Sequence, residues 1–429
     1  MWDGGPMLST VIELFKGHGE RGSEDGLNRL KRFLGKLNGY GIKLMLFVSA
    51  LAVYSFSNLN HPGWYNHYVY LADAFIHGRL DLRGDVTGYP LFDLDIVHVD
   101  GKAYIPFPPT PAVLLIPWVL VSGLNASQEF MTHLIGACNV VLAYSLLKKF
   151  GCREDVALAL TILFGFGTVH WYAAMIGTTW FYAHVVAVFF TLLSFLNILG
   201  KDRPFLAGLL LGAAALSRQL TILSSFFILL RLKKKGEHFF RKAVRFIIGA
   251  AIPIGLYMIY NYVRVGAIFD VTYQSLYHLY RPEASKTYGM FDVHWIPSGL
   301  YIMLLKGPEY IGEFPWQPLK FPYFKPSEYG MSMLLVTPMF LYALKAREKD
   351  LEIIGCWLSV IATSLISLMY FNHGWVQFGY RFSLDFTPTL MLLVARGFKN
   401  KLTSIRIIGI LYCILVNAWG VYWGNILHW

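Results

Sequence analysis

A series of apolar runs, most of them close to 20 residues long, is the feature of this sequence that most restricts its fold. A helix of about 20 consecutive apolar residues crosses the hydrocarbon core of a bilayer. Charged residues make up only 15% of the chain, whereas ordinary soluble domains contain about 25%. A water-exposed surface this apolar would aggregate. The sequence therefore predicts an all-α polytopic membrane protein.

The apolar runs predict about eleven transmembrane helices, which form one domain, 42–429, after a basic tail, 1–41. The spans are about 42–60, 129–147, 155–172, 179–199, 204–217, 219–232, 244–262, 330–344, 352–371, 382–396 and 405–425. Two of them, 204–217 and 219–232, are short and meet at Arg218. They are predicted as a hairpin that need not cross the membrane fully.

Lys and Arg gather in short clusters at alternate ends of the spans, as at Lys148-Lys149 and at 233–235. Clusters of this kind mark the cytoplasmic side of a membrane protein. They predict a plasma-membrane protein with its N-terminus in the cytoplasm and its C-terminus outside. A nucleic-acid partner is excluded despite the net charge of +11, because the cations do not form a continuous stripe along a groove.

Two long segments, 61–128 and 263–329, are then predicted on the outer side of the membrane. In the first, the apolar residues 112–124 follow a proline-rich entry and are too few to cross the bilayer. They are predicted as a re-entrant or interfacial helix. In the second, residues 291–306 are predicted as a further interfacial helix.

Residues 66–78 follow the spacing of an amphipathic helix that lies flat on the membrane surface. Its apolar positions recur at intervals of three and four residues. Its polar face either is solvated or lines a cavity. That polar face consists of Asn66, Tyr70, Asp73 and His77.

Residues 95–105 alternate between apolar and polar positions around Asp100-Gly101, which predicts a small β-hairpin. The hairpin would place Asp93 and Asp95 at its start. Those two acids either cap and solvate the hairpin or face the same cavity as Asp73.

Three arginines, Arg218, Arg264 and Arg381, lie near the predicted outer interface. Cations at membrane depth are costly unless they serve a purpose, and the planar arginine fork suits a phosphate. Two of these arginines also have a structural explanation that needs no phosphate. Arg381 could pair with Asp385 at i, i+4, and Arg264 could extend to the interface from within its span.

Four stretches of sequence resemble one known family, the glycosyltransferase C (GT-C) superfamily of multi-pass enzymes that use polyprenyl-phosphate sugars. The stretches are Asn66-His67-Tyr68 through Ala72-Asp73-Ala74-Phe75 with His77-Gly78-Arg79-Leu80, Pro106 to Pro111, Gly208-Leu209-Leu210-Leu211-Gly212 with Leu216-Ser217-Arg218, and Gly374-Trp375-Val376-Gln377-Phe378-Gly379-Tyr380-Arg381. Within the superfamily, the chain looks most like the protein mannosyltransferases and aminoarabinose transferases.

The resemblance implies a glycosyltransferase that moves a sugar from a polyprenyl-phosphate donor to a hydroxyl of a glycan, lipid or protein on the outer face. It implies inversion at the sugar, an acid of the first outer loop as general base, and arginines on the donor phosphate. The family's usual acidic pair is missing from 61–67, so Asp73 is the first choice of base and Asp95 the second. The arginines are Arg218, Arg264 and Arg381, and the predicted pocket residues are Asn66, His67, Tyr70, His77, Asp93 and Tyr380.

Two other functions remain open at this stage. One is a lipid or glycan transporter (a flippase), although charges crowd one side rather than the middle of the spans. The other is a ligase for lipid-diphosphate glycans, with His61, His67 or His373 as its base. No cofactor is required by any of these reactions. No metal is predicted, although the clustered Asp and His leave a divalent metal open. The four cysteines lie outside the outer loops, so no disulfide is expected.

Overall fold

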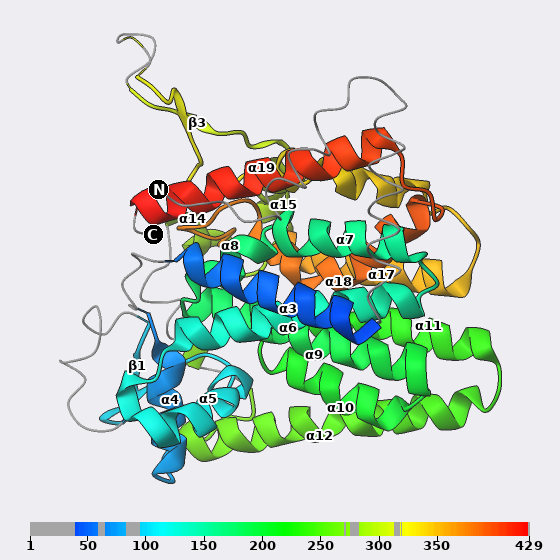
Figure 1. The fold of residues 1–429 in the computed structure, drawn as a ribbon. Coiled ribbons are helices and arrows are strands. Elements are labelled where there is room, and N and C mark those ends of the chain that lie inside the picture. Colours follow the sequence, from blue (N-terminus) through cyan, green and yellow to red (C-terminus); the bar gives the residue numbers. More distant parts are fainter. Residues whose placement is uncertain are drawn as a thin grey trace.

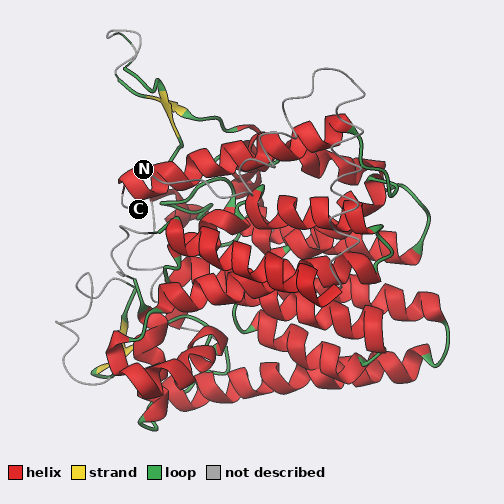
Figure 2. Ribbon diagram, in the orientation of Figure 1, coloured by secondary structure: helices red, strands yellow, loops and turns green. Residues whose placement is uncertain are grey.

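The computed structural model describes residues 39–58, 65–82, 95–269, 272–274, 283–312, 318 and 320–427. Over these residues the chain is mainly helical, and two small antiparallel hairpins are the strand structure present (Figure 2). The predicted Asp93, His61 and almost all of the tail 1–41 lie outside the described residues.

The long helices lie side by side and run in alternating directions, and the short elements α4, α5 and β1 gather at one end of them (Figure 1). The helices of the first half are α3 (Gly39–Phe56), α4 (His67–Ile76), α5 (Thr110–Ser122), α6 (Gln128–Lys149), α7 (Glu154–Phe166), α8 (His170–Ile176), α9 (Thr179–Leu196), α10 (Pro204–Ala215), α11 (Ser225–Lys235) and α12 (Phe239–Val265). Those of the second half are α14 (Glu283–Tyr288), α15 (Ile296–Leu300), α16 (Met333–Val336), α17 (Leu351–Leu368), α18 (Thr387–Gly397) and α19 (Ser404–Leu427). The strands are β1 (Val97–Val99), β2 (Lys102–Tyr104), β3 (Glu309–Tyr310) and β4 (Phe324–Lys325).

Helical structure occupies each of the eleven predicted spans, but not every helix is long enough to cross alone. Within the described ranges, six helices have the length and composition of a membrane span, and the bent pair α7–α8 would make a seventh. The helix α10 has 12 residues and so reaches only about 18 Å. The multi-pass membrane fold is thus confirmed, whereas the count of eleven crossings stays a prediction.

The outward faces of several long helices carry exposed apolar side chains, as a lipid-facing surface requires. On α12 they are Phe240, Ile247, Ile248, Ile252, Leu256, Ile259 and Val263, and on α19 they are Ile405, Ile408 and Leu415. The exposed apolar surface supports the membrane assignment made from the sequence.

The segment 204–217 folds back as predicted, and small residues explain how closely it packs. A Cβ atom on Gly208 of α10 would lie 2.0 Å from the Phe246 carbonyl oxygen of α12, and one on Gly249 would lie 2.1 Å from the Phe205 carbonyl oxygen. Glycines of this kind let two membrane helices touch backbone to backbone. The turn after α10 then reaches the first outer loop, where the Thr110 amide donates to the Leu216 carbonyl oxygen at 3.2 Å.

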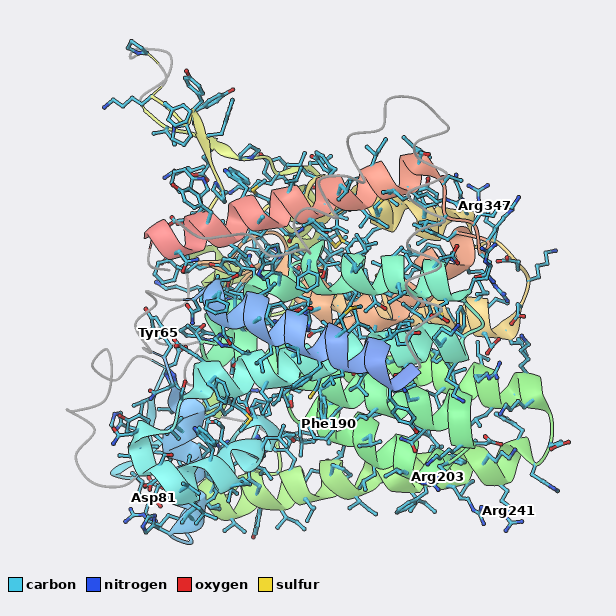
Figure 3. The ribbon with its side chains drawn as sticks, in the orientation of Figure 1. Tyr65, Asp81, Phe190, Arg203, Arg241 and Arg347 are labelled. Atoms are coloured by element: carbon cyan, nitrogen blue, oxygen red, sulfur yellow. The ribbon has the colours of Figure 1, made fainter. Side chains whose placement is uncertain are left out.

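The two ends of the helical bundle differ in charge. Figure 3 shows Arg203, Arg241 and Arg347 at one end and Tyr65 and Asp81 at the other, with Phe190 between them. We call the first the basic end and the second, where α4, α5 and β1 lie, the loop end.

Candidate functional site at the loop end

The predicted flat helix is α4, and its first turn is fixed to two long helices. The His67 backbone amide and its Nδ1 atom contact the Thr179 hydroxyl at 3.1 and 3.0 Å, and the Tyr68 amide donates to Gln128 Oε1 at 3.3 Å. Because Thr179 begins α9 and Gln128 begins α6, these bonds position the first outer loop over the ends of both. His67 is buried and acts here as a structural anchor.

The predicted β-hairpin is confirmed, and Asp95 lies just before it. Val97 pairs with Tyr104 and Val99 with Lys102, and Asp100 and Gly101 both have positive φ, as a tight two-residue turn demands. This turn sets the register of the hairpin and so the position of Asp95.

The Asp95 carboxylate is half-buried beside an aromatic pair. Its Oδ2 atom accepts the Trp180 Nε1–H at 3.0 Å, and the Trp180 ring lies 4.9 Å from the ring of Tyr65. Burial raises the pKa of Asp95 to about 6, while the Trp180 hydrogen bond and the charge of Arg381 act in the opposite direction. A carboxylate titrating near 6 is suited to accept a proton close to neutral pH.

Arg381 is a buried cation for which no carboxylate among the described residues forms an ion pair. Its guanidinium lies 5.3 Å from the rings of both Phe181 and Phe382. Among the described residues, Nη1 donates to the Trp375 carbonyl oxygen at 3.4 Å, and the buried Nε has no acceptor. A buried charge without a partner is expensive to keep, which makes Arg381 the natural place for an anion.

A second arginine, Arg218, approaches the same phenyl ring from the α10–α11 turn. It lies 5.2 Å from the Phe382 ring and is held by Asp385, which accepts Nη2–H at 3.0 Å and Nε–H at 3.2 Å. The His184 Nδ1 contacts the same carboxylate at 2.9 Å. Asp385 therefore anchors both Arg218 and His184, and the i, i+4 pair of Arg381 with Asp385 that the sequence allowed is absent.

The phenol of Tyr273 is influenced by the charges of Asp95, Arg218 and Arg381. Burial raises the pKa of this phenol; the Tyr370 hydroxyl, which contacts it at 2.7 Å, opposes the rise. The positive charges of Arg218 and Arg381 also lower the pKa of Tyr273, whereas the negative charge of Asp95 raises it. The geometric link between the two arginines is the Phe382 ring, which lies 5.2 Å from Arg218 and 5.3 Å from Arg381.

The environment of Arg264 differs from that of Arg381, because uncharged oxygen atoms accept hydrogen bonds from the Arg264 guanidinium. It donates to the carbonyl oxygen of Ile105 at 2.9 Å and to the Thr272 hydroxyl at 2.9 Å. It also stacks on Tyr260 at 4.6 Å. The side chain joins the end of α12 to the exit of the β-hairpin, a structural role that sequence spacing does not reveal.

The remaining predicted residues lie around the site rather than at its charged centre. Asp73 pairs with His77 at 3.5 Å, and His77 is exposed. Tyr70 is half-buried on the same helix, and the Asn66 Oδ1 atom is buried without a partner. The Tyr380 hydroxyl contacts Ser367 at 3.1 Å within the core.

Five residues around the site were not predicted from the sequence as site residues: Trp180, His184, Asp385, Tyr273 and Tyr370. His184 and Asp385 are 201 residues apart, so no local motif joins them. The one available signal was Asp385 itself, an acid near the start of an apolar run. No group of three His, Cys, Asp or Glu able to hold a metal occurs in the described part of the chain.

No protein-family model and no curated protein matches this sequence. Among solved structures, the chain is similar to ArnT from Cupriavidus metallidurans bound to undecaprenyl phosphate, at 11% identity and a TM-score of 0.53. The match covers 85% of this chain and 61% of ArnT, so the chain spans less than two thirds of that protein.

The chain is also similar to the Archaeoglobus fulgidus oligosaccharyltransferase tethered to an acceptor peptide, at 15% identity over 90% of this chain and 54% of that one. That TM-score, 0.41, is too low to carry an argument. The likeness to ArnT is a likeness of fold, and it agrees with the resemblance found in the sequence motifs.

Proposed function

We propose that the protein is a membrane glycosyltransferase that moves a sugar from a polyprenyl-phosphate donor to an acceptor hydroxyl at the loop end. One observation carries the proposal: Arg381 is buried, lacks a carboxylate partner among the described residues, and its charge acts on the half-buried Asp95. The fold shared with ArnT, a protein solved with undecaprenyl phosphate, supports it.

In the proposed reaction, Arg381 and Arg218 receive the phosphate of the donor. When the acceptor oxygen bonds to the anomeric carbon, the bond from that carbon to the phosphate oxygen breaks and the phosphate keeps the electron pair. Preorganised cations stabilise charge that develops on a leaving group. The Arg381 Nε–H has no acceptor among the described residues and can donate to the phosphate. Asp385 holds Arg218 in place by accepting hydrogen bonds from two Arg218 nitrogens.

The proposed general base is Asp95 rather than Asp73, the first choice from the sequence. The Asp95 carboxylate accepts the Trp180 hydrogen bond and is influenced by the charge of Arg381, whereas Asp73 is engaged with His77 on α4. Asp95 takes the proton of the acceptor hydroxyl as the oxygen attacks. Direct attack from the side opposite the phosphate inverts the sugar's configuration, so no covalent sugar–enzyme intermediate is needed.

Charge distribution sets the proposed orientation. The basic end faces the cytoplasm under the positive-inside rule, so the loop end faces outward and the acceptor is a glycan, lipid or protein on that side. The plasma membrane, a cytoplasmic N-terminus and an external C-terminus belong to the same proposal.

The test uses membranes that contain the full-length protein and a panel of labelled polyprenyl monophosphate sugars. We expect label to move into the lipid, glycan or protein fraction with the native chain, and not with Asp95→Asn or Arg381→Gln. Equal transfer by all three proteins would refute the residue roles.

Two further arms of the test separate the competing functions. Transfer only from a lipid-diphosphate glycan would indicate a ligase. Movement of a labelled lipid across proteoliposomes without any transfer would indicate a transporter.

A further inference from the structure

The basic end contains a surface hollow that plays no part in the proposed reaction. The hollow has a volume of about 380 Å³ and lies between the end of the 3-10 helix Pro338–Lys345 and the first turns of α17. Its lining residues are Leu344, Ala346, Arg347, Glu348, Lys349, Ile354 and Trp357.

The shape of the hollow is fixed by hydrogen bonds at its base. The Trp357 Nε1–H donates to the Ala346 carbonyl oxygen at 2.9 Å, and the Arg347 Nε–H donates to the Leu344 carbonyl oxygen at 2.8 Å. These two bonds hold the turn after the 3-10 helix against α17. A tryptophan at this level is typical of the boundary between lipid and water.

Two of the residues that line the hollow, Arg347 and Lys349, are exposed cations. Neither Arg347 nor Lys349 forms an ion pair with a carboxylate of the described residues. The acid between them, Glu348, lies 3.8 Å from Arg396, so its charge is already directed to another cation. The Nη1 and Nη2 atoms of Arg347 have no carboxylate partner among the described residues, so they can bind an anion.

Two stripes of exposed apolar side chains lead away from the hollow toward the middle of the membrane. One follows the 3-10 helix through Leu344 and Leu341, and the other follows α17 from Ile354. The exposed members of the second stripe are Ile354, Leu358, Ile361 and Leu365. The surface thus combines two exposed cations with two stripes of exposed apolar side chains.

We propose that this hollow binds the headgroup of an anionic phospholipid, with the acyl chains lying along the two apolar stripes. Charge complementarity selects this occupant, because unpaired cations at the end of a membrane span attract anionic lipids of the adjacent leaflet. Free phosphate lacks the chains that the stripes would contact, and a zwitterionic lipid lacks the net charge. The site is separate from the proposed reaction at the opposite end.

The proposal is tested with the purified full-length protein, delipidated and then exposed to equal amounts of phosphatidylglycerol and phosphatidylcholine. Lipid that remains bound is counted by native mass spectrometry. We expect phosphatidylglycerol to be retained preferentially, and the double variant Arg347→Gln/Lys349→Gln to lose that preference by at least about tenfold, because each basic residue contributes about fivefold.

A matched control removes two exposed cations of the first turns of α12, Arg241 and Arg245, neither of which lines the hollow. Arg241→Gln/Arg245→Gln should keep the preference within about twofold of the native protein. Equal loss in both double variants would overturn the proposal, because it would show general attraction to a basic surface. Competition by inorganic phosphate at the same concentration as the lipid would also overturn it.

Discussion

Two buried charged residues at opposite ends of the molecule, Glu352 and Arg381, differ in whether they have a partner of opposite charge. At the basic end, Glu352 accepts hydrogen bonds from Arg231 and Lys234, and Asp202 pairs with Lys242 at 2.7 Å. At the loop end, Arg381 is buried between phenyl rings with no carboxylate partner in the described ranges. An unpaired buried charge makes the fold less stable, and our proposal assigns this one to the donor phosphate.

The largest expected effect is on the acid at the loop end. Asp95→Asn preserves the Trp180 contact in shape but removes the base, so sugar transfer should fall on the order of 10²–10⁴-fold. The measurement is the rate of label transfer from the polyprenyl monophosphate donor. Donor binding should change little, which distinguishes loss of the base from collapse of the site.

Replacing the unpaired cation tests the comparison between the ends directly. Arg381→Gln should lower transfer by about 10²–10³-fold, since one preorganised donor to the developing charge is lost. Thermal unfolding should stay the same or shift upward, because a desolvated charge without a partner is removed. A large drop in unfolding temperature would mean that Arg381 is structural.

The pH dependence of transfer should follow the raised pKa of Asp95. The pKa is about 6, so the carboxylate is protonated below that value and transfer should fall as pH drops through 6 and level off above it. Trp180 donates to the charged form and lowers the pKa. Trp180→Phe should therefore move the midpoint to higher pH in a pH–rate profile.

The matching change at the basic end should alter stability instead of activity. Glu352→Gln leaves Arg231 and Lys234 without their shared carboxylate, and should cost about 1–3 kcal/mol of unfolding free energy. Transfer at a temperature well below unfolding should remain native. Denaturant unfolding in detergent and the transfer assay together check both halves of this expectation.

The smallest effect on transfer and stability is expected when Asp73 on α4 is replaced. Asp73 and His77 form an i, i+4 pair in which His77 is exposed, and such pairs contribute about 0.2–0.5 kcal/mol. Asp73→Asn should lower stability by no more than that and leave transfer near the native rate. A loss of transfer comparable with that of Asp95→Asn would restore Asp73 as the base.

The parts that the sequence predicted correctly depend on local chemistry. The Asp100-Gly101 turn specifies the hairpin within a few residues, and the spacing of apolar residues in 66–78 specifies α4. The proline-rich entry and the shortness of 112–124 indicated α5. Each of these signals is complete within about a dozen residues, so tertiary packing is not needed to interpret it.

The parts that the sequence could not supply depend on contacts across the fold. Residues Arg381–Asp385 form a 3-10 helix, in which i and i+3 share a face rather than i and i+4, so Asp385 does not turn toward Arg381. It pairs instead with Arg218, 167 residues away. Arg264 likewise donates to the Ile105 carbonyl oxygen, 159 residues away.

The central claim is that the donor phosphate lies on Arg381, and it is tested most directly by an experimental structure of the full-length protein with bound undecaprenyl phosphate. The account predicts a phosphate oxygen within about 3 Å of the Arg381 guanidinium, with Arg218 on the same phosphate and Asp95 facing the position of the sugar. A phosphate bound elsewhere, with Arg381 still unpaired among its phenyl rings, would contradict the account.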